Sequence, residues 1–180
     1  MKKLFILAFM ALAFNAWSQD DWSTFKTEDG KAQATLPGTP QLQSQTVPTP
    51  MGDVTMNMNM LDLSSSGGDN MMMGVITMIY PEAMRDSTNT SEKMAAFFDK
   101  SMNGAAANTG GTVKSSNDFE MNGHPGREFS IEIMGGMAVI KMKMVMVGTT
   151  SYALQVISKG DKEDNEEAKT FIDSFMLEDN

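Results

Sequence analysis

The sequence predicts an α+β domain built on an antiparallel β-sheet with flanking helices. Of its 180 residues, 41% are hydrophobic and 21% are charged, which is typical of one globular domain with a hydrophobic core. Short stretches of apolar residues, some alternating with polar ones and most bounded by turn residues, dominate the chain. Two helical patterns interrupt them, one in the middle and one at the end. This order is typical of a sheet covered by helices and not of repeated βαβ units.

The first 18 residues have the pattern of a secretory signal peptide. Lys2 and Lys3 precede an apolar run over residues 4–14, which is too short to span a bilayer. Ala16 and Ser18 are the small residues that a cleavage site before Gln19 requires. We therefore expect export, cleavage there and a single domain over residues 19–180. An uncleaved anchor helix is the alternative.

Charge and cysteine content restrict the partners and the compartment. The chain has no cysteine, which excludes thiol redox chemistry and a cysteine-linked lipid anchor. Without Lys2 and Lys3, 12 basic residues stand against 23 acidic ones, a net charge of about −11. So acidic a protein is not expected to bind nucleic acid or to enter a membrane after cleavage. We expect a periplasmic or extracellular protein.

The first half of the mature chain is predicted to form five strands. An Asp-Gly turn at Asp29 and Gly30 separates two short strands, and a third is cut off by Pro48 and Pro50. The next alternates strictly with period two, and the fifth is apolar on both faces, as in a central strand. These five strands are predicted over residues 22–27, 31–36, 41–47, 54–60 and 71–80.

The second half begins and ends with a helix. Asn89, followed three residues later by Glu92, is typical of a helix start, and apolar residues at helical spacing predict a helix over residues 91–106. A polar strand suited to a sheet edge follows, and then a hairpin turning at Gly135 and Gly136. Strands are predicted over residues 112–121, 127–134, 137–147 and 151–158. A helix capped within residues 164–167 closes the chain.

Four short patterns resemble the PsbP-like superfamily of α/β/α sandwiches. Residues 30–40 read Gly-x-x-x-x-x-Leu-Pro-x-x-Pro, and residues 122–128 read Asn-Gly-His-Pro-Gly-Arg-Glu. Tyr152-x-Leu154 is similar to a late strand of that superfamily, and residues 171–175 to its terminal Ser-Phe helix. The resemblance implies an α/β/α sandwich used for docking, as in a photosystem II extrinsic subunit and a nuclear Ran-binding protein. No ligand or partner residue of the superfamily matches a motif here.

Candidate catalytic and metal residues have simpler explanations. His124, the one histidine, lies in a predicted turn with no nucleophile signature near it, and a lone histidine does not hold zinc. The acidic residues 161–167 fit the start of a helix, and the glycine pairs fit turns. Residues 86–88 and 89–91 match glycosylation acceptor patterns, although turn and cap roles explain them as well. We predict no catalytic, cofactor or metal residue.

Methionine is the compositional exception. The chain has 20 methionines, against nine leucines and eight isoleucines. The preferred interpretation is that they fill the core, on the apolar faces of two strands under the helices. The alternatives are a thioether site for Cu(I) or Ag(I) and an oxidant sink. The residues concerned are Met56, Met58, Met60, Met142, Met144 and Met146.

The function expected from the sequence is therefore that of an exported, non-catalytic binding or accessory domain. Its partner is expected to be a protein of the cell envelope. The alternatives are a methionine-based Cu(I) or Ag(I) binding protein and a hydrolase without a recognisable motif.

Overall fold

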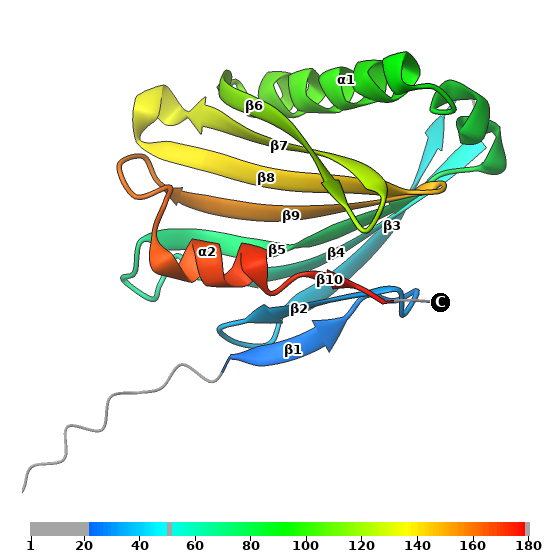
Figure 1. Cartoon of the computed structure of the whole chain (residues 1–180). Coiled ribbons are helices and arrows are strands. Elements are labelled where there is room, and N and C mark those ends of the chain that lie inside the picture. Colours follow the sequence, from blue (N-terminus) through cyan, green and yellow to red (C-terminus); the bar gives the residue numbers. More distant parts are fainter. Residues whose placement is uncertain (1–21, 50–51, 179–180) are drawn as a thin grey trace, which may run out of the picture.

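Two antiparallel sheets form the framework of the protein. The computed structural model describes residues 22–49 and 52–178. A seven-stranded sheet has the order β3-β4-β5-β9-β8-β7-β6, and a three-stranded sheet has the order β1-β2-β10 (Figure 1). The large sheet contains β3 (Gln41–Thr49), β4 (Gly52–Asp62), β5 (Asn70–Ile79), β6 (Thr112–Met121), β7 (His124–Ile133), β8 (Ala138–Val147) and β9 (Thr150–Lys159). The small sheet contains β1 (Ser23–Lys26), β2 (Ala32–Leu36) and β10 (Met176–Leu177).

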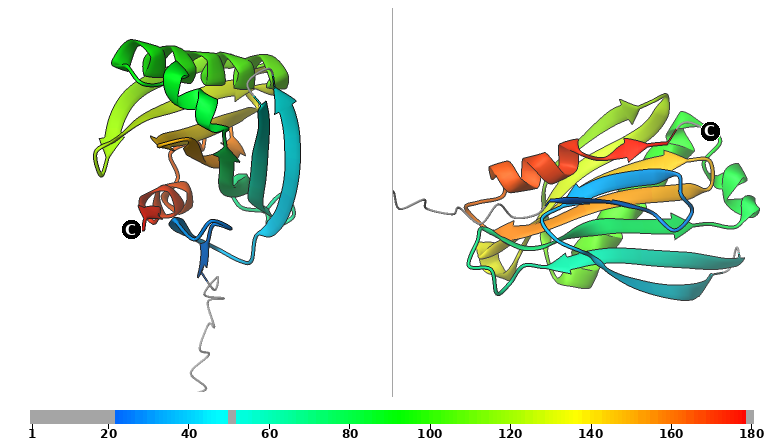
Figure 2. Two further views of the ribbon diagram at one scale, coloured as in Figure 1. Left: turned by 90° about the vertical axis from the view of Figure 1, so that its right-hand side faces the viewer. Right: turned by 90° about the horizontal axis from the view of Figure 1, so that it is seen from below.

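The large sheet is strongly curved and covered on both faces. Helix α1 (Ser91–Thr109) lies against β6 and β7 on one face, whereas α2 (Glu166–Asp173) and the small sheet lie on the other (Figure 2). The predicted mixed α+β class with an antiparallel sheet is confirmed. The separate small sheet was not predicted; in it, β2 pairs with β1 and with β10. A two-residue strand leaves no periodic pattern that a sequence could show.

Each covered face has its own hydrophobic core. Between the large sheet and the layer of α2 and the small sheet, the largest fully buried side chains include Tyr152, Phe171 and Leu36. Beneath α1, the core contains Phe98, Phe129 and the methionines of β8. β5 is central, as predicted, between β4 and β9. β3 continues through Pro48 because an edge strand tolerates the missing amide hydrogen.

The methionines do not all lie in the core, which corrects the preferred interpretation. Met142, Met144 and Met146 of β8 are buried under α1. On β4 the burial is reversed, since Asn57 and Asn59 are buried and the three methionines are partly exposed. The reason is the turn between β1 and β2, from which Glu28 accepts hydrogen bonds from the Asn59 amide at 3.0 and 3.2 Å. The polar face of β4 therefore points inward.

Both helices form close to where the sequence predicts them. The Thr90 side chain, not Asn89, caps α1 by accepting a hydrogen bond from the Lys93 amide. The helix runs to Thr109 and ends at Gly110, whose φ of 62° is left-handed. Asn165 caps α2 by accepting from the Ala168 amide at 2.9 Å. A short 3₁₀ helix before α1, η1 (Glu82–Ser87), was not predicted.

The turn between β7 and β8 is longer than the predicted two-residue hairpin. Met134, Gly135 and Gly136 all have positive φ and form a short 3₁₀ turn, η2 (Met134–Gly136). The turn between β6 and β7 is tight, with Asn122 and Gly123 both at positive φ. The expected signal peptide, residues 1–18, lies outside the described residues. Within them, no helix has the length and apolar character needed to cross a membrane.

Candidate functional site

The main candidate site is a groove between η1 and α1, which we call the η1–α1 groove. It opens beside the end of β5 and has a volume of about 730 Å³, within the range of ligand-binding sites. It is mostly apolar, with charged groups at its rim. The lining residues are Tyr80, Met84, Asp86, Ser87, Lys93, Ala96, Phe97, Lys100 and Ser101.

Aromatic contacts fix the floor of the groove. Tyr80, the residue after β5, packs edge-on against Phe97 of α1, with ring centroids 5.7 Å apart. Phe97 in turn contacts Phe98, which is buried against the sheet. Met84 closes the η1 side and is also buried. The floor is thus anchored to the core beneath α1, so that it is held in place without a ligand.

The rim carries two ammonium groups on one face of α1. Lys93 and Lys100 are seven residues apart, two helical turns, and both side chains line the groove. The Lys93 ammonium donates to the carbonyl oxygen of Asp86 at 2.6 Å and to Asn89 Oδ1 at 3.1 Å. Within residues 22–49 and 52–178, neither lysine forms an ion pair. Among the described residues, Asp86 is the one carboxylate that lines the groove.

Tyr80 links the groove to the open part of the sheet. Its hydroxyl donates to the sulfur of Met78 at 3.2 Å. Burial raises the pKa of Tyr80. The hydroxyl therefore stays protonated and acts as a donor near neutral pH.

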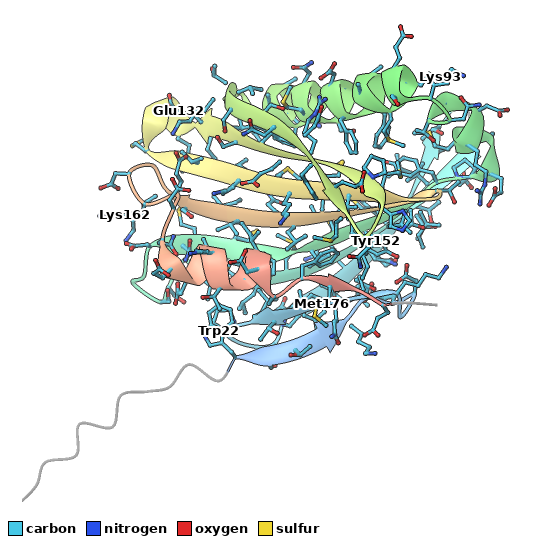
Figure 3. The ribbon with its side chains drawn as sticks, viewed as in Figure 1. Trp22, Lys93, Glu132, Tyr152, Lys162 and Met176 are labelled. Atoms are coloured by element: carbon cyan, nitrogen blue, oxygen red, sulfur yellow. The ribbon has the colours of Figure 1, made fainter. Side chains whose placement is uncertain are left out.

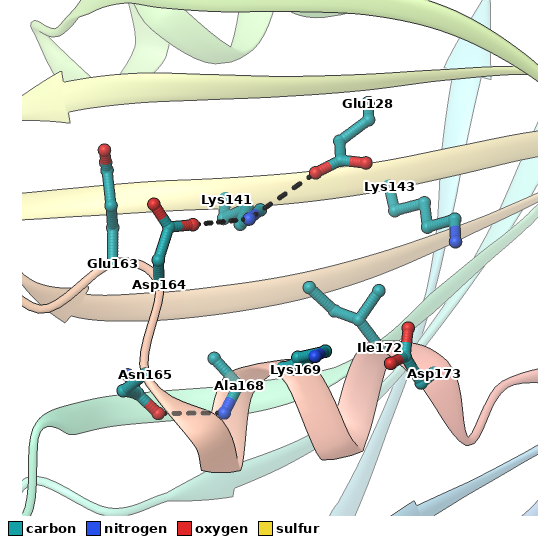
Figure 4. Close-up of a pocket in the computed structure, with 10 residues that line it drawn as sticks. All are labelled: Glu128, Lys141, Lys143, Glu163, Asp164, Asn165, Ala168, Lys169, Ile172 and Asp173. Carbon is teal, nitrogen blue, oxygen red and sulfur yellow. Dashed lines mark hydrogen bonds and ion pairs between the residues drawn. The ribbon is translucent and has the colours of Figure 1, made fainter.

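A second, smaller cleft lies between β7, β8 and the start of α2 (Figure 4). At its centre the Lys141 ammonium contacts Asp164 at 2.9 Å and Glu128 at 3.5 Å. Burial lowers the pKa of Lys141, but these two carboxylates raise it more, while Lys141 lowers the pKa of Asp164. The paired charges connect the loop before α2 to the sheet. This cleft therefore has a structural explanation.

His124 lies in a third cavity, of about 210 Å³, near the C-terminal strand. It is the first residue of β7 and is paired with Met121 across the hairpin. Tyr152 lines the same cavity, and no serine or threonine of the described part of the chain does. No group of three or more histidine, aspartate or glutamate side chains in the described ranges is placed to hold a metal ion.

The sequence did not predict the η1–α1 groove, and some of its residues were given other interpretations. Residues 86–91, considered as glycosylation acceptors, supply the groove rim and the cap of α1. The spacing of Lys93 and Lys100 was the one available signal. It could not reveal the groove, because Met84, which closes one side, belongs to the unpredicted η1 turn.

A seven-stranded antiparallel sheet with α1 on one face, and α2 with a small sheet on the other, is a PsbP-like fold. The solution structure of cyanobacterial PsbP (CyanoP) from Synechocystis sp. PCC 6803 is similar to this chain with a TM-score of 0.57. The two are 13% identical, over 91% of this chain and 96% of that one. The fold predicted from the four sequence patterns is therefore confirmed.

A crystal structure of protein PA94 from Pseudomonas aeruginosa, a protein of unknown function, is less similar. Its TM-score is 0.44 at 7% identity, over 88% of this chain and 99% of that one. No family model matches the sequence, and neither does any curated protein.

Proposed function

We propose that the protein is a non-catalytic binding module, exported to the cell envelope, that holds a protein partner in the η1–α1 groove. The observation that carries this proposal is the combination of a rigid aromatic floor with two lysines at the rim. Aromatic side chains are enriched in protein interfaces because they bury a large area at a low cost in side-chain entropy. A preformed floor also avoids part of the ordering cost of binding.

The charge of the groove indicates the chemistry of the partner. The chain as a whole has a net charge of −9, but the groove has two lysines and one aspartate. A partner segment with apolar side chains and at least one carboxylate would complement both features. A basic segment would instead be attracted to the rest of the surface.

Two features support a non-catalytic role. The hydroxyl of Ser101 donates to the carbonyl of Phe97 at 2.9 Å, so it is used within the helix. The single histidine of the chain, His124, lines a different cavity. Among the described residues, no histidine lines the groove, and histidine is the base that most often activates a serine nucleophile.

Site-specific photocrosslinking in intact cells tests the proposal. A photoreactive phenylalanine analogue placed at Ala96, an exposed residue that lines the groove, should give a discrete protein adduct. The same analogue at Thr24, exposed on the small sheet, should not give that adduct. Mass spectrometry of the adduct should place the crosslink in an acidic, partly apolar segment of the partner.

Charge reversal supplies the second half of the test. Lys100→Glu should reduce the Ala96 adduct at least about tenfold, since it replaces attraction with like-charge repulsion at the rim. Lys159→Glu, which reverses an exposed lysine outside the groove, should leave the adduct unchanged. An adduct equally strong from Thr24, or insensitive to Lys100→Glu, would place the partner elsewhere.

A further inference from the structure

The methionines of β4 and β5 form a row of thioethers on the face of the large sheet that carries α1. Met56 on β4 is the direct partner of Met78 on β5, and Met58 follows two residues later on the same face. Directly opposite residues in an antiparallel pair have Cβ atoms about 4.5–5.5 Å apart. Same-face neighbours along one strand are about 6–7 Å apart. Three flexible thioethers therefore start within reach of one point.

The side chains of Met56, Met58 and Met78 are not part of either hydrophobic core. α1 covers the matching methionines of β8, which are buried, and lies against β6 and β7, and Ile76 of β5 packs against the cluster beneath it. Met56, Met58 and Met78 are partly exposed, and among the described residues they belong to neither of the two core clusters. Solvent reaches them, so an ion has an entry path.

The sulfur atoms already have polar neighbours. The side-chain amide of Gln45 donates to Met56 Sδ at 3.3 Å, and the Tyr80 hydroxyl donates to Met78 Sδ at 3.2 Å. In both residues a sulfur lone pair therefore points at a polar donor and not into a hydrocarbon contact. A cation with sulfur affinity could replace these weak hydrogen bonds.

We propose that Met56, Met58 and Met78 bind one soft monovalent ion, Cu(I) or Ag(I), through their three thioether sulfurs. Neutral thioethers select Cu(I) and Ag(I) over hard cations, which prefer carboxylates and carbonyls. The opposite residues on β3 are Gln45 and Gln43, neutral amides that add no competing hard anion. The negative charge of the chain favours a cation. Ligation changes no oxidation state and releases no proton, because a thioether carries none.

Methyl NMR of the full-length purified protein tests the proposal directly. With ¹³C-methyl-labelled methionine and one equivalent of silver nitrate, the resonances of Met56, Met58 and Met78 should shift together and saturate at one ion per chain. Anaerobic competition with a Cu(I) chelator then measures affinity. Each single substitution of these methionines by leucine should weaken Cu(I) binding at least about tenfold, since loss even of an outer-shell group costs that much. Leucine keeps the volume and the apolar character.

Methionines outside the proposed site provide matched controls. Met60→Leu changes the same face of the same strand, where Met60 Sδ lies over Gly74, and should change affinity less than about threefold. Met134→Leu with Met137→Leu changes two strongly exposed thioethers in the β7–β8 turn, with the same expectation. Far-ultraviolet circular dichroism confirms that each variant is folded. Cu(I) binding that survives the triple substitution, or a loss at Met60→Leu as large as at Met58→Leu, would overturn the assignment.

Discussion

The hydroxyl of Tyr152 donates a hydrogen bond to the carboxylate of Asp29 and thereby joins the two sheets. Tyr152 is a fully buried residue of β9 (Figure 3), and Asp29 belongs to the turn between β1 and β2. Thr27 and the amide of Lys31 donate to the other oxygen of the same carboxylate, at 2.7 and 3.1 Å. The Asp29 side chain thus stabilises its own turn and also joins that turn to the large sheet.

Removing the tyrosine hydroxyl should loosen this junction. Tyr152→Phe keeps the buried ring and removes a hydrogen bond to a charged acceptor, so the free energy of unfolding should fall by roughly 1–2 kcal/mol. Urea unfolding followed by tryptophan fluorescence measures this change, since Trp22 lies beside β1 (Figure 3). A variant as stable as the wild type would show that the hydrogen bond contributes nothing net.

The same junction predicts a dependence on pH. Burial raises the pKa of Asp29, but the hydrogen bonds from Tyr152, Thr27 and Lys31 together lower it below 3.8. A lowered pKa in the folded state stabilises the protein above the unfolded pKa, and this contribution disappears as the pH falls through the folded value. The stability difference between wild type and Asp29→Asn should therefore be present at pH 7 and shrink below about pH 4. Asp53→Asn, at an exposed position of β4, is the control in the same titration.

Removing the acidic partners of Arg127 should destabilise the protein more than replacing Arg127 itself. Its side chain is buried on β7 and contacts Asp99 of α1 and Asp118 of β6. Removing both acids by Asp99→Ala and Asp118→Ala leaves a buried charge unpaired, which should cost roughly 2–4 kcal/mol. Arg127→Met removes the buried charge itself and leaves only the two exposed carboxylates, so it should lower the free energy of unfolding by less. Thermal unfolding ranks the two variants, and the reverse order would contradict this account.

Alanine substitutions at two glycines should change the free energy of unfolding in opposite directions. A Cβ on Gly74 of β5 would lie 2.1 Å from the carbonyl oxygen of Asn59 and 2.6 Å from Met60 Sδ, so Gly74→Ala should destabilise by about 2 kcal/mol or more. A Cβ on Gly104, in α1, meets no atom within 4 Å. Gly104→Ala should stabilise by about 0.5–1 kcal/mol through its higher helix propensity. Denaturant midpoints of both variants check the two signs.

Export should end with cleavage before Gln19. Ala16 and Ser18 supply the small residues that the cleavage site needs. Intact-mass spectrometry of the exported protein should find Gln19 as the first residue, and Ala16→Leu should delay processing. A mature protein that begins at Met1 would contradict the signal-peptide interpretation.

Local patterns in the sequence were sufficient for most elements. Strict alternation identified β4, the Asp-Gly turn identified the first hairpin, and capping residues identified the starts of both helices within one or two positions. Each of these signals depends on neighbours a few residues away, which a single chain displays directly. The PsbP-like fold could also be predicted from the sequence, because turn and strand patterns spread over the chain indicate it.

Which face of a strand is buried was decided only by the tertiary structure. The alternation of β4 identified two faces, but Glu28, from a turn far earlier in the chain, holds Asn59 inward, and the face with Asn57 and Asn59 is buried while the methionines stay partly exposed. The η1–α1 groove likewise forms because Tyr80 and Met84 meet α1 in space. Burial and site geometry depend on contacts between residues distant in sequence, and a periodic pattern carries no information about what will pack against it.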